Sequence, residues 1–140
     1  MLDLKHILAS TAANGGCTYN VVYGDLAGTA SYAVALFPER SVVLDHSLTF
    51  RDLLDFVLDN ADLLARPDVS LGTWEHEGQT WLDVVGTIED RGRAERLGRA
   101  LDQIAIFDLG NLEEIPTGGT GKAFPADMPL EERLELLVTA

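Results

Sequence analysis

The sequence predicts an α+β fold in which helices pack on one face of a mostly antiparallel sheet. Segments with alternating apolar residues, typical of strands, and segments with apolar residues at helical spacing follow one another in the order βββ-α-ββ-α-β. This order favours antiparallel strands with separate helices. The 46% hydrophobic content of the 140 residues is enough for one continuous core without disulfides or metals.

The first expected element is a short helix. Leu4, Ile7 and Leu8 recur at helical spacing, and Asn14-Gly15-Gly16 supplies a left-handed cap at the C-terminal end. Three strands rich in Tyr, Val and Thr follow, at residues 17–23, 29–37 and 41–45. Turn-forming residues separate them, so the three strands are expected to pair as an antiparallel meander.

A helix over residues 50–65 is the best-specified element. Thr49 and Asp52 resemble a capping box, and Arg66-Pro67 ends the helix. At about 100° per residue, one face of this helix is apolar. It consists of Phe50, Leu53, Leu54, Val57, Leu58, Ala61 and Leu64. Four carboxylates line the opposite face, namely Asp52, Asp55, Asp59 and Asp62.

The second half of the chain is expected to hold a hairpin of residues 69–75 and 80–89, a helix over 91–103 capped by Asp90, and a strand at 105–108. We therefore divide the chain into three parts: a single α+β domain at 1–116, a Gly/Pro-rich linker at 117–126 and a C-terminal amphipathic helix at 127–140. The last helix either docks on the core or detaches to bind a partner.

Acidic side chains dominate the charge of the chain. With 23 acidic and 10 basic residues, its formal net charge is -13, which disfavours nucleic acid as a direct ligand and indicates a basic partner. Cys17 is the only cysteine, which fits a reducing compartment. The N-terminus lacks the pattern of a secretory signal, and no uninterrupted apolar run reaches about eighteen residues. A cytoplasmic protein without a membrane segment is expected.

One glycine-rich segment, Gly118-Gly119-Thr120-Gly121-Lys122, invites comparison with a phosphate-binding loop. Pro116 stands where such a loop needs its first glycine, and Ala123 stands where it needs a magnesium-binding hydroxyl. A flexible linker is the better interpretation.

The histidines and the cysteine are candidates for metal or nucleophile chemistry. His6, His46 and His76 have carboxylates nearby in the sequence, but their spacing matches no zinc pattern. Cys17 lies in a predicted strand, where a single cysteine is typical of a small buried hydrophobe. The sequence therefore predicts no catalytic residue, no metal ligand and no cofactor.

The row Asp52, Asp55, Asp59 and Asp62 is the predicted partner-binding site. Carboxylates roughly 4.5 to 6 Å apart along a helix resemble the phosphates of a nucleic-acid strand and fit a groove lined by Arg and Lys. Aspartate has a poor helix propensity, which favours a functional use. A solvated face that keeps the protein soluble is the alternative.

Two further surfaces have competing interpretations. Trp74 and Trp81 flank the hairpin either as an exposed binding patch or, as is more common, as cross-strand packing residues. The arginines of the helix over 91–103 are either solvated or contact an acidic partner, including the aspartate row of a second copy in a homodimer.

Five short segments carry a resemblance to known proteins. They are Tyr19-Asn20-Val21, Gly72-Thr73-Trp74, Leu82-Asp83-Val84, the run from Gln103 to Asp108 and the run from Glu114 to Gly119. Across roughly residues 19–121 the chain resembles uncharacterised small acidic proteins encoded by phages, prophages and plasmids of high-GC bacteria. By analogy, this resemblance implies an inhibitor of host defence of the anti-CRISPR or antirestriction type, several of which mimic DNA.

The sequence thus favours a non-enzymatic protein-binding module of a mobile element. Its expected partner is a basic surface of a host nucleic-acid-binding protein, with no direct nucleic-acid ligand and no membrane. One alternative is a small enzyme or metabolite-binding domain that uses Cys17 or the histidines. The other is a structural or assembly protein whose last helix docks on a partner.

Overall fold

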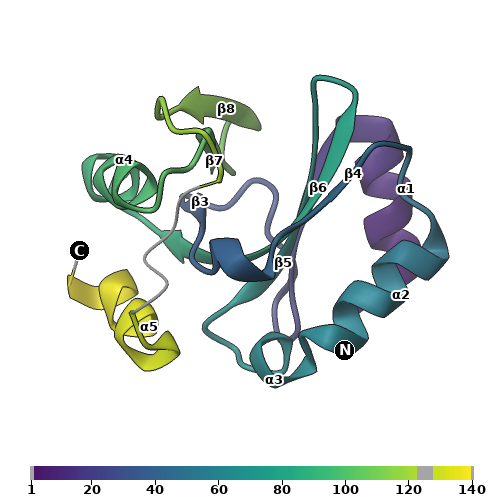
Figure 1. Cartoon of the computed structure of the whole chain (residues 1–140), viewed down its shortest axis with the longest axis horizontal. Helices are drawn as coiled ribbons and strands as arrows, with labels where there is room; N and C mark the ends of the chain where they lie inside the picture. The colour runs from purple at the N-terminus through teal and green to yellow at the C-terminus, as the bar shows by residue number, and fades with distance from the viewer. Residues whose placement is uncertain (1, 123–127, 140) are drawn as a thin grey trace. The chain divides into compact units, whose positions relative to one another are not determined.

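The computed structural model describes residues 2–122 and 128–139, and its chain divides into two compact units (Figure 1). Unit 1 holds Met1–Leu26 and Arg40–Val84, and unit 2 holds Ala27–Glu39 and Val85–Ala140. Helices alternate with antiparallel strands in both units, which confirms the predicted α+β class. No helix among the described residues is both long enough and apolar enough to cross a membrane.

Unit 1 combines three helices with paired strands. In chain order its elements are α1 (Leu4–Asn14), β1 (Gly16–Asn20), β2 (Gly24–Asp25), β4 (Val42–Leu44), α2 (Phe50–Asp59), α3 (Ala61–Leu64), β5 (Ser70–His76) and the first part of β6 (Gln79–Ile88). β1 pairs with β2 on one side and with β5 on the other, and β4 pairs with β6. α1 packs on β1 and β5 and lies beside α2 (Figure 1).

Unit 2 is built around the end of β6. Its elements are β3 (Tyr32–Ala35), α4 (Arg91–Ala100), β7 (Ala105–Asp108), β8 (Glu113–Pro116) and α5 (Leu130–Thr139), with a 3-10 helix at Pro38–Arg40 reaching the boundary with unit 1. β3 pairs with β6 and with β7, and β7 pairs with β8. α4 packs on β3 and β7.

The predicted meander of the first three strands is wrong. Strands form at all three places, but β1 pairs with β5, while β3 and β4 pair with successive parts of β6. Alternation shows that a segment is extended and does not identify its partner, because pairing depends on contacts distant in the chain. The short edge strands β2 and β8 were not predicted, since they are rich in Gly, Asp and Glu instead of β-branched residues.

The predicted helix over 50–65 is interrupted at Asn60. The buried Asn60 side chain donates from Nδ2 to the Phe56 carbonyl oxygen (2.9 Å) and accepts at Oδ1 from Arg40 (3.1 Å). The Asn60 backbone N–H donates to the same Phe56 carbonyl oxygen (3.1 Å), and Asn60 has the non-helical dihedrals φ -117° and ψ 21°, so α2 ends and the short α3 begins. Asp62 therefore lies on a different helix from the other three aspartates.

The side of α2 that is buried also differs from the prediction. Leu53 and Phe56 are its buried side chains, whereas Phe50 and Leu58 are 47% and 64% exposed. At about 100° per residue, the buried side is rotated by roughly a quarter turn from the expected apolar face. Phe50 and Leu58 of the expected apolar face are consequently left at the surface.

The capping box at the start of α2 is confirmed. The Thr49 side chain accepts from the Asp52 backbone N–H (3.2 Å), and the Asp52 carboxylate accepts from the Thr49 backbone N–H (3.1 Å). We expect Thr49→Ala to lower the free energy of unfolding by about 1 kcal/mol, because both reciprocal bonds weaken. Urea denaturation measures this, with the exposed neighbour Ser47→Ala as control. Equal effects of the two substitutions would show that the box contributes nothing.

The last helix packs on its own unit. Leu134 is buried, and the side chain of Leu137 fills the space where a Cβ on Gly86 would lie. Residues 117–121 are hydrogen-bonded to the turn after α4, since Thr117, Gly119 and Gly121 donate from their backbone N–H groups to residues 102–104. The predicted linker at 117–126 and helix at 127–140 include residues 123–127 and 140, which lie outside the described residues.

Candidate functional site

Asp52, the first of the four predicted binding carboxylates, serves the local structure. Its Oδ2 accepts from the Thr49 backbone N–H, from the Thr49 hydroxyl (2.8 Å) and from His46 Nε2 (3.0 Å). The Thr49 hydrogen bond is the main reason that the pKa of Asp52 lies below its ordinary value. This carboxylate is therefore held in place by the cap and is only partly available to a partner.

The other three aspartates are exposed. Asp55 pairs with Arg51 one turn earlier (3.3 Å), and Asp62 pairs with Arg40 (3.0 Å), which lowers the pKa of Asp62. Both carboxylates remain 57% exposed. The Asp59 carboxylate is exposed and makes no hydrogen bond or ion pair within the described part of the chain. The exposed pair of Arg51 and Asp55 is weak, so Asp55 can exchange its partner at little cost. Arg40 holds Asp62 more firmly, with two hydrogen bonds of 3.3 and 3.0 Å.

Exposed apolar side chains also occur on α2. Phe50, Leu54 and Leu58 recur every four residues and so form one stripe along the helix, with Phe50 and Leu58 exposed and Leu54 half-buried. We call Phe50, Leu58, Asp55, Asp59 and Asp62 together the α2–α3 surface. The sequence pattern indicated the carboxylates but placed the apolar stripe in the core, because periodicity does not reveal which part of a wide apolar face finds a neighbour.

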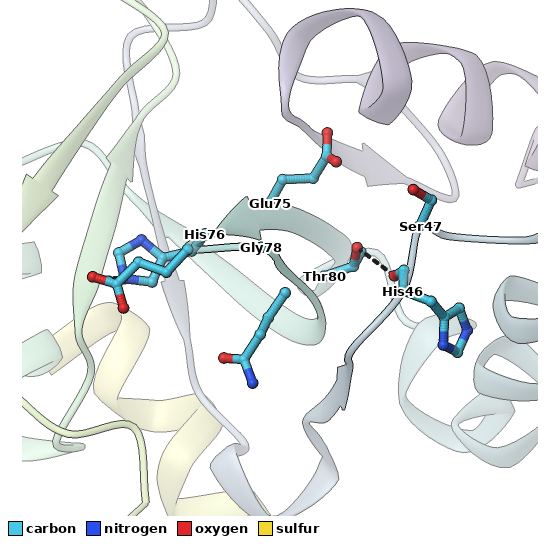
Figure 2. A pocket seen from close by; sticks show the side chains of 8 residues that line it. His46, Ser47, Glu75, His76, Gly78 and Thr80 are labelled. Atoms are coloured by element: carbon cyan, nitrogen blue, oxygen red, sulfur yellow. Dashed lines mark hydrogen bonds and ion pairs between the residues drawn. The ribbon is translucent and has the colours of Figure 1, made fainter.

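A hollow of about 310 Å³ lies at the tip of the β5–β6 hairpin (Figure 2). Its lining comprises His46, Ser47, Glu75, His76, Glu77, Gly78, Gln79 and Thr80. The two histidines point away from each other in Figure 2, and the Thr80 hydroxyl donates to the His46 carbonyl oxygen (3.1 Å) at one side of the hollow. His46 contacts Asp52 and Asp45, which raise its pKa, while His76 stacks on Trp74. The imidazoles do not converge on a common ligand.

His6, Cys17 and Asp25 are brought together by the fold. His6 Nε2 lies 2.7 Å from Asp25 Oδ2, and Cys17 Sγ lies 4.0 Å from the same oxygen. The three side chains come from α1, β1 and β2. Sequence reasoning singled out His6 and Cys17 separately and missed Asp25, which it assigned to a turn.

The hairpin between β1 and β2 explains why Asp25 lies there. Asn20 Oδ1 accepts from the backbone N–H groups of Val22 (2.9 Å) and Tyr23 (3.1 Å), which closes a tight turn. Asp25 is then the cross-strand partner of Tyr19, on the side that Cys17 shares two residues earlier. The Asn at 20 and the Gly at 24 were the available signals for this turn.

Cys17 is not poised as a nucleophile. Burial, and secondarily the negative charge of Asp25, raise the pKa of its thiol to about 11. The thiol is therefore uncharged near neutral pH, whereas a nucleophilic cysteine needs a thiolate.

The two tryptophans contact each other across the β5–β6 hairpin. Trp74 on β5 and Trp81 on β6 have ring centroids 6.2 Å apart in a tilted arrangement, and both are half-buried. This contact fits the cross-strand packing interpretation.

Two glycine amides of the glycine-rich segment are already engaged within the protein. The backbone N–H groups of Gly119 and Gly121 donate to the carbonyl oxygens of Gln103 (3.0 Å) and Asp102 (2.7 Å). No protein-family model, curated protein or solved structure matches the chain.

Proposed function

We propose that this chain is a non-enzymatic protein-binding module whose α2–α3 surface docks on a basic surface of a nucleic-acid-handling protein. The supporting observation is the composition of α2 and α3, which carry the exposed Asp55, Asp59 and Asp62 together with the exposed Phe50 and Leu58. A face that served solvation alone would not need large exposed apolar side chains. Carboxylates give orientation and a fast encounter, and apolar anchors slow dissociation.

The partner is a protein with an Arg- and Lys-lined groove that otherwise holds nucleic acid. The formal net charge of -13 attracts such a groove and repels nucleic acid itself. We propose that the module acts in the bacterial cytoplasm as an inhibitor of a defence or nucleic-acid-handling complex, as the mobile-element resemblance implies. Asp52 is left out of the contact because its carboxylate caps α2.

The test is capture from bacterial lysate with the wild type and two variants. The first, Asp55→Asn/Asp59→Asn/Asp62→Asn, removes charge, and the second, Phe50→Ser/Leu58→Ser, removes the apolar anchors. We expect wild type to capture a DNA-binding protein at low salt, with loss of capture at high salt and upon addition of competing duplex DNA. Each variant should weaken the affinity at least tenfold, since several groups are removed at once.

A matched control separates the surface from the overall charge. Glu77→Gln/Glu89→Gln/Glu113→Gln also removes three exposed carboxylates but leaves α2 and α3 unchanged. Equal weakening by the control and by the aspartate variant would mean that only net charge matters. Capture that survives high salt, DNA and both surface variants would refute the proposed surface.

The two alternatives receive less support. An enzyme or metabolite-binding site around the histidines lacks converging imidazoles in the hollow of Figure 2, and the Cys17 thiol is uncharged. An assembly protein that docks by a free C-terminal helix needs α5 released, and α5 packs through Leu134 and Leu137 on unit 2.

A further inference from the structure

Three different metal-binding donors lie within reach of one another at the start of the chain. His6 Nε2, Cys17 Sγ and Asp25 Oδ2 all lie within 4.8 Å of one another. His6 and Asp25 side chains are 45% and 27% exposed, whereas Cys17 is buried beneath them. An ion from solvent can therefore reach a site whose floor is a sulfur atom.

The arrangement of the nitrogen, sulfur and oxygen donors fits a tetrahedrally coordinated metal ion better than a proton relay. His6 Nε2 and Cys17 Sγ both face the same Asp25 oxygen, so the donors converge on one point. In a nucleophile relay the carboxylate would hold one ring nitrogen and the other would face the sulfur. Here the sulfur lies 4.0 Å from the same carboxylate oxygen that His6 Nε2 contacts at 2.7 Å.

The distances need only small adjustments to hold zinc. Tetrahedral zinc with ordinary Zn–N, Zn–S and Zn–O bonds places its ligand atoms roughly 3.4 to 3.6 Å apart. The His6 to Asp25 separation of 2.7 Å would open by under about 1 Å, and the Cys17 to Asp25 separation of 4.0 Å would close by about half that. The exposed His6 side chain and the half-buried Asp25 side chain would make such shifts by small side-chain rotations.

The surroundings orient these donors. The Thr11 hydroxyl of α1 lies 2.5 Å from that of Thr73, the cross-strand partner of Cys17, so α1 is held over the face that carries the cysteine. Asp3 accepts from the His6 backbone N–H (3.1 Å), and the His6 ring lies against Tyr19 with centroids 5.8 Å apart. Such supporting contacts commonly hold metal ligands in position.

We propose that His6, Cys17 and Asp25 bind a divalent transition-metal ion of the zinc class. A thiolate, an imidazole and a carboxylate suit zinc, cobalt(II) or iron(II), whereas Mg²⁺ and Ca²⁺ prefer sites made of oxygen alone. Three protein ligands leave the fourth position open to water or to a group from a partner. The ion would displace the proton of the Cys17 thiol. Its positive charge would then offset the negative charges of the Cys17 thiolate and the Asp25 carboxylate in a chain that is already strongly acidic. This site is independent of the α2–α3 surface.

Cobalt(II) titration of the reduced, chelator-treated full chain tests the site, because a cysteine thiolate bound to cobalt gives a charge-transfer band in the near ultraviolet. We expect the band to saturate at one ion per chain, to disappear upon addition of Zn²⁺ and to persist with excess Mg²⁺. Cys17→Ser should abolish the band, and His6→Gln and Asp25→Asn should each weaken the affinity at least about tenfold.

His46→Gln is the matched control, since His46 also contacts a carboxylate (Asp52, 3.0 Å) but lies far along the chain from the cysteine. It should leave the titration unchanged. The His6 side chain is exposed, so the His6→Gln variant should fold. A second measurement is thermal denaturation, in which Zn²⁺ should raise the Tm of the wild type and leave the Tm of His6→Gln unchanged. No band in the wild type, or equal affinity in His6→Gln, would overturn the site.

Discussion

Glu39→Ala is expected to lower the free energy of unfolding of unit 2 by about 3 kcal/mol, because it leaves a buried cation without its carboxylate. Arg133 of α5 is only 1% exposed and forms an ion pair with Glu39. It also donates to the Met128 carbonyl oxygen (3.0 Å) and lies over the Phe37 ring, 5.8 Å from its centroid. The expected loss is at the low end of the range for breaking a buried ion pair, since Glu39 is itself 26% exposed and partly hydrated.

Urea denaturation and hydrogen exchange of the α5 amides measure this loss, and exchange reveals whether α5 opens alone before the rest unfolds. Adding Arg133→Met to Glu39→Ala should recover most of the stability, because an apolar side chain of similar length removes the buried charge. Glu113→Ala, which truncates an exposed carboxylate of the same unit, should stay within about 0.5 kcal/mol. If Glu39→Ala matched that control, the ion pair would not hold α5 in place.

Asp83→Asn is expected to stabilise the protein at neutral pH. Asp83 on β6 accepts from the Ser41 hydroxyl (2.6 Å), and burial raises the pKa of its carboxyl from 3.8 to about 6. The folded chain therefore binds the carboxyl proton of Asp83 more tightly than the unfolded chain does. As a result, the contribution of Asp83 to the free energy of unfolding falls as pH rises from about 4 to about 6. Above pH 6 the ionised carboxylate carries the full cost of its burial.

The expected gain in the free energy of unfolding at pH 7 is at most about 3 kcal/mol, since each unit of pKa corresponds to about 1.4 kcal/mol. This value is an upper limit because the Asp83 residue as a whole is half-buried. Asparagine keeps the oxygen that Ser41 needs and cannot ionise. Urea denaturation of wild type and Asp83→Asn at pH 4 and pH 7 measures the gain, which should vanish near pH 4. Asp59→Asn, an exposed control, should show no comparable pH-dependent difference. A gain of the same size at both pH values would rule out ionisation as its cause.

Local signals determined much of the secondary structure. The Asn14-Gly15 end of α1, where Gly15 has φ 82°, the Thr49–Asp52 capping box and the Asp90 cap of α4 all occur where the sequence predicts them. Such features depend on residues within about four positions of one another, so a short stretch of sequence contains all the information they need. The alternation of Leu82 and Val84 along β6 was likewise predictable, and both are buried.

The candidate sites were only partly predictable. The aspartates of α2 could be read from helical spacing, but the exposure of Phe50 and Leu58 depends on how α2 packs beside α1. The meeting of His6, Cys17 and Asp25 depends on one short hairpin and on a helix held by Thr11 and Thr73. Neither contact leaves a periodic pattern in the sequence.

By itself, then, the sequence determined the α+β class, the helix caps and the strong negative charge, because composition and short-range geometry suffice for these. Only the tertiary structure decided the strand partners, the break at Asn60, the docking of α5 through a buried Arg133 and the grouping of His6 with Cys17 and Asp25. Each of these depends on residues far apart in the chain, whose contacts arise only when distant segments compete for the same buried surface.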